Sequence, residues 1–272
     1  PAIQLSEGLP QSFLGVPDTP PRDLNWAVWE RDYKWPTVYQ WNFAIQRELP
    51  WSFSWTTAYV GSSSNFVFGS YNWNGSPPGP LATEQQRRRI PQWNSISLGT
   101  PFGHASYHGM DVQLQRRYSA GLFVNVGYTW SHSIDNIPEQ FGSGGGGLMD
   151  FRNFNLNRGN SNFDIRHRFI LSTAYEFPIG RGKRWMNRGG IVNGILGGWE
   201  LSNLWHMQTG DYFTVTVPNT RARLGATGIG DWWPDRIRDP RLSERTAARW
   251  FDTSAFASPR NPDGTWRLGN AG

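Results

Sequence analysis

The chain of 272 residues contains no cysteine. It therefore has no disulfide framework, cysteine-ligated zinc site, iron–sulfur cluster or thiol nucleophile. Charged residues make up only 17% of the chain, and no apolar run reaches the 18 or so residues that a membrane-spanning helix needs. The chain starts at Pro1 without a signal-peptide pattern, from which we expect an interior piece of a longer precursor or a processed form.

Glycine, proline and tryptophan are plentiful instead, with 31, 19 and 16 copies. Glycine and proline are costly inside a helix, so this composition predicts an all-β chain with many turns. The net charge of +5 suits nucleic acid, anionic lipid or a general basic surface equally well.

Apolar and polar residues alternate over long stretches. In the first of them Tyr39, Trp41, Phe43 and Ile45 share one face, and polar residues lie between them. This period of two predicts strands. We expect residues 1–36 to be an irregular loop segment and 37–272 to hold about six long strands, near 37–47, 51–61, 106–118, 121–134, 165–177 and 199–217. Runs of roughly ten residues or more match the length that crosses a bilayer.

The connections alternate in length. Two links within strand pairs are short and a third, Pro178–Gly198, is of medium length, whereas the links between pairs are long: Gly61–Ala105, Asp135–Asp164 and Pro218–Asp252. The predicted fold is an all-β, antiparallel up-and-down meander that forms part of a transmembrane β-barrel with short periplasmic turns and long outer loops. Its aromatic faces would meet lipid and its polar faces a wet lumen. Aromatic residues near strand ends are expected in the interfacial girdles, namely Tyr39, Trp51, Tyr59, Tyr118, Trp130 and Trp199.

No catalytic residue, metal site or cofactor is predicted. His104 and His108 would lie about 13 Å apart on a strand and no glutamate accompanies them. The run Gly142–Gly147 lacks the Lys-Ser or Lys-Thr of a phosphate loop. Carboxylates are frequent in the loops, but nothing singles out a catalytic pair among Asp135, Asp150, Asp231, Asp235 and Asp239.

Six loop residues are candidates for ligand binding. Arg87, Arg88 and Arg89 would contact phosphates or lipopolysaccharide, or else form a solvated patch without a partner. Trp73, Trp232 and Trp233 would stack on sugars or peptides, or else pack within their own loops.

Several of these segments together resemble a known family. Thr37–Pro50, Ser106–Asp135 and Ser161–Gly182 are similar to successive barrel segments of TonB-dependent outer-membrane receptors, most closely the Oar-like group with a carboxypeptidase-regulatory domain. The resemblance runs from about residue 37 to the end, through Gly197–Val217, Arg249–Pro259 and Leu268–Gly272 in order.

The resemblance implies a non-enzymatic role in energised uptake of a bulky ligand. Its implied partners are outer-membrane lipid, the rest of a parent barrel with its plug, and an inner-membrane TonB-type energy complex reached through an N-terminal part that this sequence lacks; nucleic acid is not among them. Six strands are too few to close the smallest common barrel, and an open sheet would leave two unpaired edges in lipid. We therefore expect a segment of a larger barrel, a barrel completed by other chains, or a different fold.

Two alternatives stay open. The first is a secreted or surface-assembled, tryptophan-rich all-β protein that binds glycans, which would bury its aromatic faces in one core at the extracellular surface. The second is a hydrolase on a β scaffold, which would need two loop carboxylates to converge, one with a raised pKa.

Overall fold

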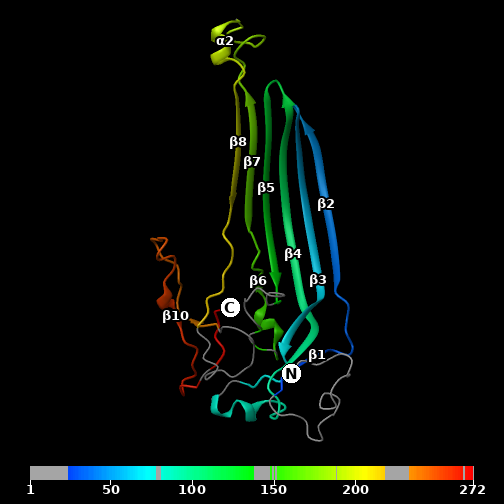
Figure 1. The fold of residues 1–272 in the computed structure, drawn as a ribbon, viewed down its shortest axis with the longest axis vertical. Helices are drawn as coiled ribbons and strands as arrows, with labels where there is room; N and C mark the ends of the chain where they lie inside the picture. Colours follow the sequence, from blue (N-terminus) through cyan, green and yellow to red (C-terminus); the bar gives the residue numbers. More distant parts are fainter. Residues whose placement is uncertain are drawn as a thin grey trace, which may run out of the picture.

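The main feature of the molecule is a tall antiparallel sheet (Figure 1). The computed structural model describes residues 24–77, 81–137, 148, 150, 152–187, 189–217, 233–265 and 267–271. Neighbours in the sheet follow one another along the chain, which confirms the predicted up-and-down meander. The sheet is open, with β2 and β8 at its two edges, and its strands are β2 (Thr37–Leu49), β3 (Phe53–Asn72), β4 (Ile96–Ser119), β5 (Leu122–Asp135), β7 (His167–Glu176) and β8 (Glu200–Gln208).

Smaller elements lie at the ends of this sheet. Two short strands extend it, since β1 (Trp26–Trp29) pairs in parallel with β4 and β6 (Gly159–Asn160) pairs with β5. A separate ribbon joins β9 (Asp235–Arg236) to β10 (Phe256–Ala257). The remaining elements are helix α2 (Ile191–Leu196) and the 3-10 turns η2 (Leu81–Thr83), η3 (Gln85–Arg87), η4 (Phe154–Asn157) and η5 (Thr253–Ala255). Within the described ranges, every helix is too short or too polar to cross a membrane.

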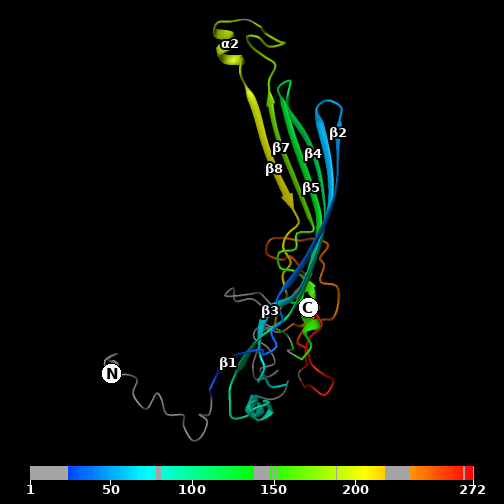
Figure 2. The same cartoon turned by 90° about the vertical axis from the view of Figure 1, so that its right-hand side faces the viewer.

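The two ends of the sheet differ. The turns between β2 and β3 and between β4 and β5 lie at one end, together with α2, and we call this the turn end (Figure 1). These turns are tight because Trp51, Ser52, Ala120 and Gly121 adopt positive φ angles. The long connections gather at the other end, the loop end, beyond the single layer of strands (Figure 2).

Strand pairing sorts the alternating residues onto two faces. One row across the sheet pairs Phe43 with Tyr59, Tyr59 with Met110 and Met110 with Trp130. We call this side the apolar face. The neighbouring row on the opposite side, the polar face, pairs Ala44, Ala58, Asp111, Thr129, Arg168 and Gln208 in turn.

The sheet has no hydrophobic core of its own at the turn end. Phe43 is 66% exposed and Trp205 57% exposed on the apolar face. The apolar side chains that are buried among the described residues lie at the loop end and in the C-terminal segment: Ile96, Phe102, Leu148 and Ala255. Apolar side chains that stay exposed over most of a sheet need another apolar medium, which for a band of this height is lipid.

The prediction that Gly61–Ala105 is a loop was wrong at both ends of this range. β3 continues to Asn72 and β4 already begins at Ile96, with bulges in their pairing near Phe66 and Phe68. The added part of β3 starts with three serines, Ser62 to Ser64, so it shows no apolar alternation. This part of β3 is covered by protein, since Phe68 stacks on Trp29 and Tyr71 packs against Phe102 and Phe154. Lipid therefore imposes no period of two on its side chains.

Two other boundaries also differ from expectation. The last strand ends at Gln208 and does not continue to Val217. Its partner β7 begins at His167, and the backbone N–H of Thr209 donates the last hydrogen bond of the ladder to the His167 carbonyl (2.9 Å). The residues after Thr209 therefore have no part of β7 to pair with. The segment 1–36, expected to be irregular, contains β1, which uses the edge of β4 that β5 no longer covers.

The residues expected in aromatic girdles lie near both ends of the apolar face. All six are exposed, from 40% for Tyr59 to 82% for Trp51. Trp51, Tyr118 and Trp199 lie at the turn end, and Tyr39, Tyr59 and Trp130 lie toward the loop end of the band.

Candidate functional site

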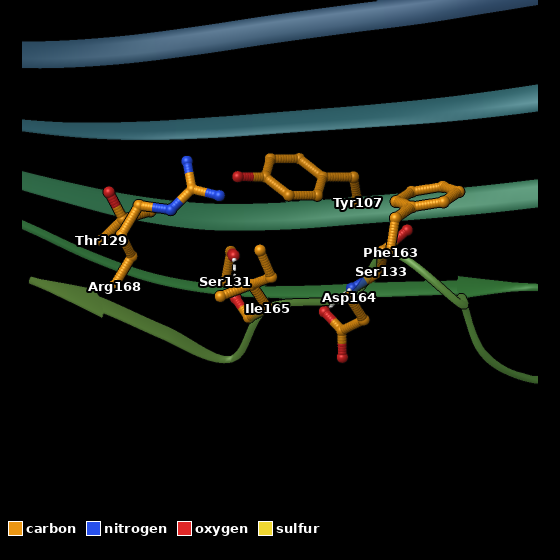
Figure 3. Close-up of a pocket in the computed structure, with 8 residues that line it drawn as sticks. All are labelled: Tyr107, Thr129, Ser131, Ser133, Phe163, Asp164, Ile165 and Arg168. Atoms are coloured by element: carbon orange, nitrogen blue, oxygen red, sulfur yellow. Dashed lines mark hydrogen bonds between the residues drawn. The ribbon is translucent and has the colours of Figure 1, made fainter. Parts of the chain in front are cut away.

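A pocket of about 160 Å³ opens on the polar face near the loop end (Figure 3). Strands β4, β5 and β7 supply part of its wall, and the segment between β6 and β7 supplies the rest. It is lined by Tyr107, Thr129, Ser131, Ser133, Phe163, Asp164, Ile165 and Arg168.

The pocket exists because the pairing of β5 is interrupted. Residues 161–166 replace the regular ladder opposite Ser131–Ser133. The Asp164 carboxylate, only 1% exposed, accepts the backbone N–H of Ser133 (2.8 Å) and lies 3.0 Å from His132 Nδ1. Ser131 Oγ donates to the carbonyl of Ile165 (2.8 Å). Asp164 thus satisfies a backbone donor that would otherwise be buried without a partner.

The exposed groups of the pocket differ from these buried ones. The Tyr107 ring lies against Gly109, where a Cβ would stand 2.6 Å from the tyrosine hydroxyl, so glycine allows the ring to lie along the wall. The Arg168 guanidinium points toward the Tyr107 hydroxyl (Figure 3), and Phe163 is 72% exposed. A cation, hydroxyls and aromatic rings together suit a ligand with an anionic or polar part and a flat part.

A second arrangement organises the connection between β3 and β4 around Asn74. This side chain is fully buried. Its Nδ2 lies 3.0 Å from each of three backbone carbonyls, those of Ile90, Trp93 and Asn94, and its Oδ1 accepts the N–H of Ile90 (2.8 Å). One amide therefore holds both ends of the loop together.

The three arginines predicted to bind ligand have different surroundings. Arg88 is inside the loop, with 10% of its side chain exposed, and pairs with Glu84 at 2.7 Å. Arg87 donates to the Thr83 hydroxyl (3.1 Å) and to the carbonyl of Pro77. Arg89 is exposed and stacks over the Trp73 ring at 4.7 Å.

The tryptophans predicted to bind ligand are not all brought together. Trp73 joins Arg89 in one patch at the loop end. Trp233 lies in the separate C-terminal segment, where its carbonyl contacts Gly269. Trp232 lies outside the described residues. Among the five candidates that the structure describes, Trp73 and Arg89 form an aromatic–cation pair.

The loop carboxylates have internal partners. Asp150 holds Arg152 at 2.7 Å, and Asp235 forms a bidentate pair with Arg267 at 2.9 and 2.6 Å. In the C-terminal segment the Ser254 hydroxyl, with Arg238 nearby, lowers the pKa of Asp252. Across the ranges that the structure describes, no three histidine or carboxylate side chains come close enough to hold a metal ion.

Two structurally important residues were missed by the sequence reasoning. Asn74 and Asp164 both follow irregular backbone, so neither lies in a periodic pattern that could mark it. The only available signal was residue type, because asparagine and aspartate hydrogen-bond to nearby backbone in turns.

We expect Arg88→Ala and Arg89→Ala to separate the structural and exposed arginines. Arg88→Ala removes a nearly buried ion pair and bonds to loop carbonyls, and should destabilise the loop by about 1–3 kcal/mol. Arg89→Ala removes an exposed cation that stacks on Trp73, with an expected change of about 0.5 kcal/mol or less. Hydrogen exchange of residues 84–94 measures both effects, and equal protection in the two variants would contradict the assignment.

Together, the open meander, the exposed apolar face, the short turns and the long connections define a wall of a transmembrane β-barrel. The family model for an outer membrane beta barrel domain matches residues 1–272. The chain therefore belongs to this family, and its location is the bacterial outer membrane. No curated protein and no solved structure matches it significantly.

Proposed function

We propose that the chain is a wall segment of a TonB-dependent outer-membrane receptor that takes up a bulky ligand and selects it through its outer loops. The observation that carries the proposal is the open six-strand sheet with tight turns at one end and long, internally bonded connections at the other. The choice of TonB-dependent receptors as the class rests on the resemblance of residues 37–272 to the barrel segments of such receptors.

The free edges of β2 and β8 support a larger barrel. Each unpaired backbone group in hydrocarbon costs several kcal/mol, so a stable wall needs further strands on both sides. A barrel of many strands encloses a wide lumen, and solutes would diffuse through it if nothing closed it. A plug and an energy-coupling complex would provide the control that such an opening requires, and both belong to the proposed partners along with outer-membrane lipid.

The connections at the loop end support selectivity. Asn74 fixes one of them, and the half-buried Trp73 and the exposed Arg89 form a stacked pair on it. The pocket around Tyr107 and Arg168 lies on the polar face, which would line the lumen. A ligand that descends from the loops would meet both sites in succession.

We further propose that the segment is not an enzyme. The described loop carboxylates Asp150 and Asp235 are each held by an arginine of their own segment, which supports a structural role for both. The family also favours the membrane interpretation over a secreted glycan-binding protein, whose aromatic faces would need a core.

Uptake by cells that carry the protein tests the proposal. We expect the cells to deplete one class of bulky solute, such as oligosaccharides or oligopeptides, from a mixed medium. Depletion should fall at least tenfold when either this chain or TonB is deleted. Deletion of TonB leaves the inner membrane energised, so it removes only the coupling to the outer membrane. Depletion that depends on the chain but not on TonB would indicate a passive pore and overturn the proposal.

A further inference from the structure

Four of the five histidines lie on the apolar face of the sheet. His108 pairs with His132 across β4 and β5, His167 follows one row nearer the turn end, and His104 lies nearer the loop end. The fifth, His206, pairs with Ile170 on the polar face. A polar ring is costly in the middle of a lipid-facing band, so the height of these histidines in the membrane decides what surrounds them.

Their height matches the outer boundary of the apolar band. From Tyr118 at the turn end to His108 is a distance of ten residues along β4. At about 3.4 Å per residue and a typical barrel tilt near 40°, this corresponds to a height of about 25 Å, which is the usual thickness of the lipid-facing band. The histidines therefore lie where hydrocarbon gives way to the head groups of the outer leaflet.

The four rings share a bonded Nδ1, but its partner is a tyrosine hydroxyl in two of them and an accepting oxygen, to which Nδ1 donates, in the other two. In each of them Nδ1 is engaged by the chain itself: His108 by the hydroxyl of Tyr59 (2.7 Å), His167 by that of Tyr128 (2.8 Å), His104 by Asn65 (3.0 Å) and His132 by Asp164 (3.0 Å). When a tyrosine hydroxyl donates to Nδ1, the ring proton resides on Nε2. The second nitrogen of His108 and His167 is then an N–H donor, and both residues are exposed.

Cations accompany the rings at the same level. Arg166 Nη2 lies 3.4 Å from His132 Nε2 and 3.6 Å from Asp164. Lys34 lies over the Phe66 ring at 5.0 Å, and that ring also packs against His104 at 6.2 Å. Asp164 is the carboxylate within this group, and it is buried. The exposed part of the group thus offers donors and positive charge.

We propose that this row binds the phosphate-bearing head groups of outer-leaflet lipid, with Nε2 of His108 and His167 and the cations Lys34 and Arg166 as contacts. Three features select this partner. The row continues the apolar face, where acyl chains would lie, it begins at head-group height, and its exposed groups complement an anion. The inference depends on the outer-membrane location and not on TonB-dependent uptake.

Native mass spectrometry of the full chain in detergent at pH 7.5 tests it, with diphosphoryl lipid A as the probe and an uncharged glycolipid as the reference. We expect the wild type to prefer diphosphoryl lipid A at least tenfold. The double variant His108→Phe/His167→Phe should lose about tenfold or more of that affinity, since each hydrogen bond to a charged group contributes on this scale. His206→Phe is the matched control, because it makes the same exchange on the polar face, and it should bind as the wild type does.

Two results would overturn the proposal. One is equal binding of the charged and uncharged lipids by the wild type, and the other is equal loss in His206→Phe and the double variant. A second variant, Tyr59→Phe/Tyr128→Phe, keeps all histidines but removes the hydroxyls that orient two of them. It should lose part of the preference while the β-sheet signal in circular dichroism stays unchanged, and an unchanged preference would also contradict the proposed geometry.

Discussion

Val112→Arg should prevent the chain from accumulating in folded form in the outer membrane, whereas Gln113→Arg should not. Val112 lies on the apolar face of β4, paired with Thr57 on one side and Tyr128 on the other. An arginine at the middle of a lipid-facing band costs about 2–4 kcal/mol. Gln113 is the next residue, exposed on the polar face, where a cation meets water.

The amount of protein in the outer-membrane fraction that resists urea extraction measures this difference. Expression of both variants from the same promoter controls for synthesis. An equal loss of protein from this fraction in the two variants would mean that both faces of β4 are packed against protein. If both variants accumulated to the wild-type amount, neither face would meet lipid.

Asn74→Ala should release the connection between β3 and β4. The substitution removes the bonds of Asn74 to three carbonyls and to the N–H of Ile90. The carbonyls of Trp93 and Asn94 keep Gln85 and Arg88 as donors, so the two groups that lose their partner are the N–H and the carbonyl of Ile90. Each buried group that loses its partner costs about 1–3 kcal/mol, so two such groups give an expected local loss of about 3 kcal/mol.

Trypsin provides the measurement, because Arg87, Arg88 and Arg89 lie in the same connection. Cleavage of a transiently opened loop follows the population of the open form, so a loss of about 3 kcal/mol should accelerate cleavage there more than a hundredfold. Gln86→Ala, at an exposed position of the same loop, should leave the rate unchanged. An unaltered rate in Asn74→Ala would show that the amide does not hold the loop.

The sequence was informative where lipid imposes alternation. Phe43, Tyr59, Met110 and Trp130 each belong to a run in which apolar residues recur at every second position, and pairing places them in one row across four strands. The meander and its tight turns followed from that period and from the lengths of the connections. Beyond the lipid-facing band, as between Ser62 and Asn72 in β3, the pattern disappears although the strand continues.

The candidate sites were harder to predict because they depend on contacts between distant segments. The three consecutive arginines look equivalent in sequence, but Glu84 and the loop carbonyls engage Arg88 while Arg89 stacks on Trp73. The pocket of Tyr107 and Arg168 needs the interrupted ladder opposite Ser131–Ser133. No local pattern in the sequence predicts that a six-residue segment will lie opposite only three residues of the neighbouring strand.

The even number of strands in the sheet has a consequence for how such walls evolve. β2 starts and β8 finishes on the same side of the membrane, at the loop end (Figure 1). Six strands at a spacing of about 4.8 Å form a panel roughly 29 Å wide. Both edge strands have their outer ends on the same side of the membrane. Duplication or deletion of such a panel therefore changes the circumference of the barrel, and every other hairpin keeps its orientation across the membrane. Pore width can thus vary between descendants in whole hairpins, without reversing any segment across the bilayer.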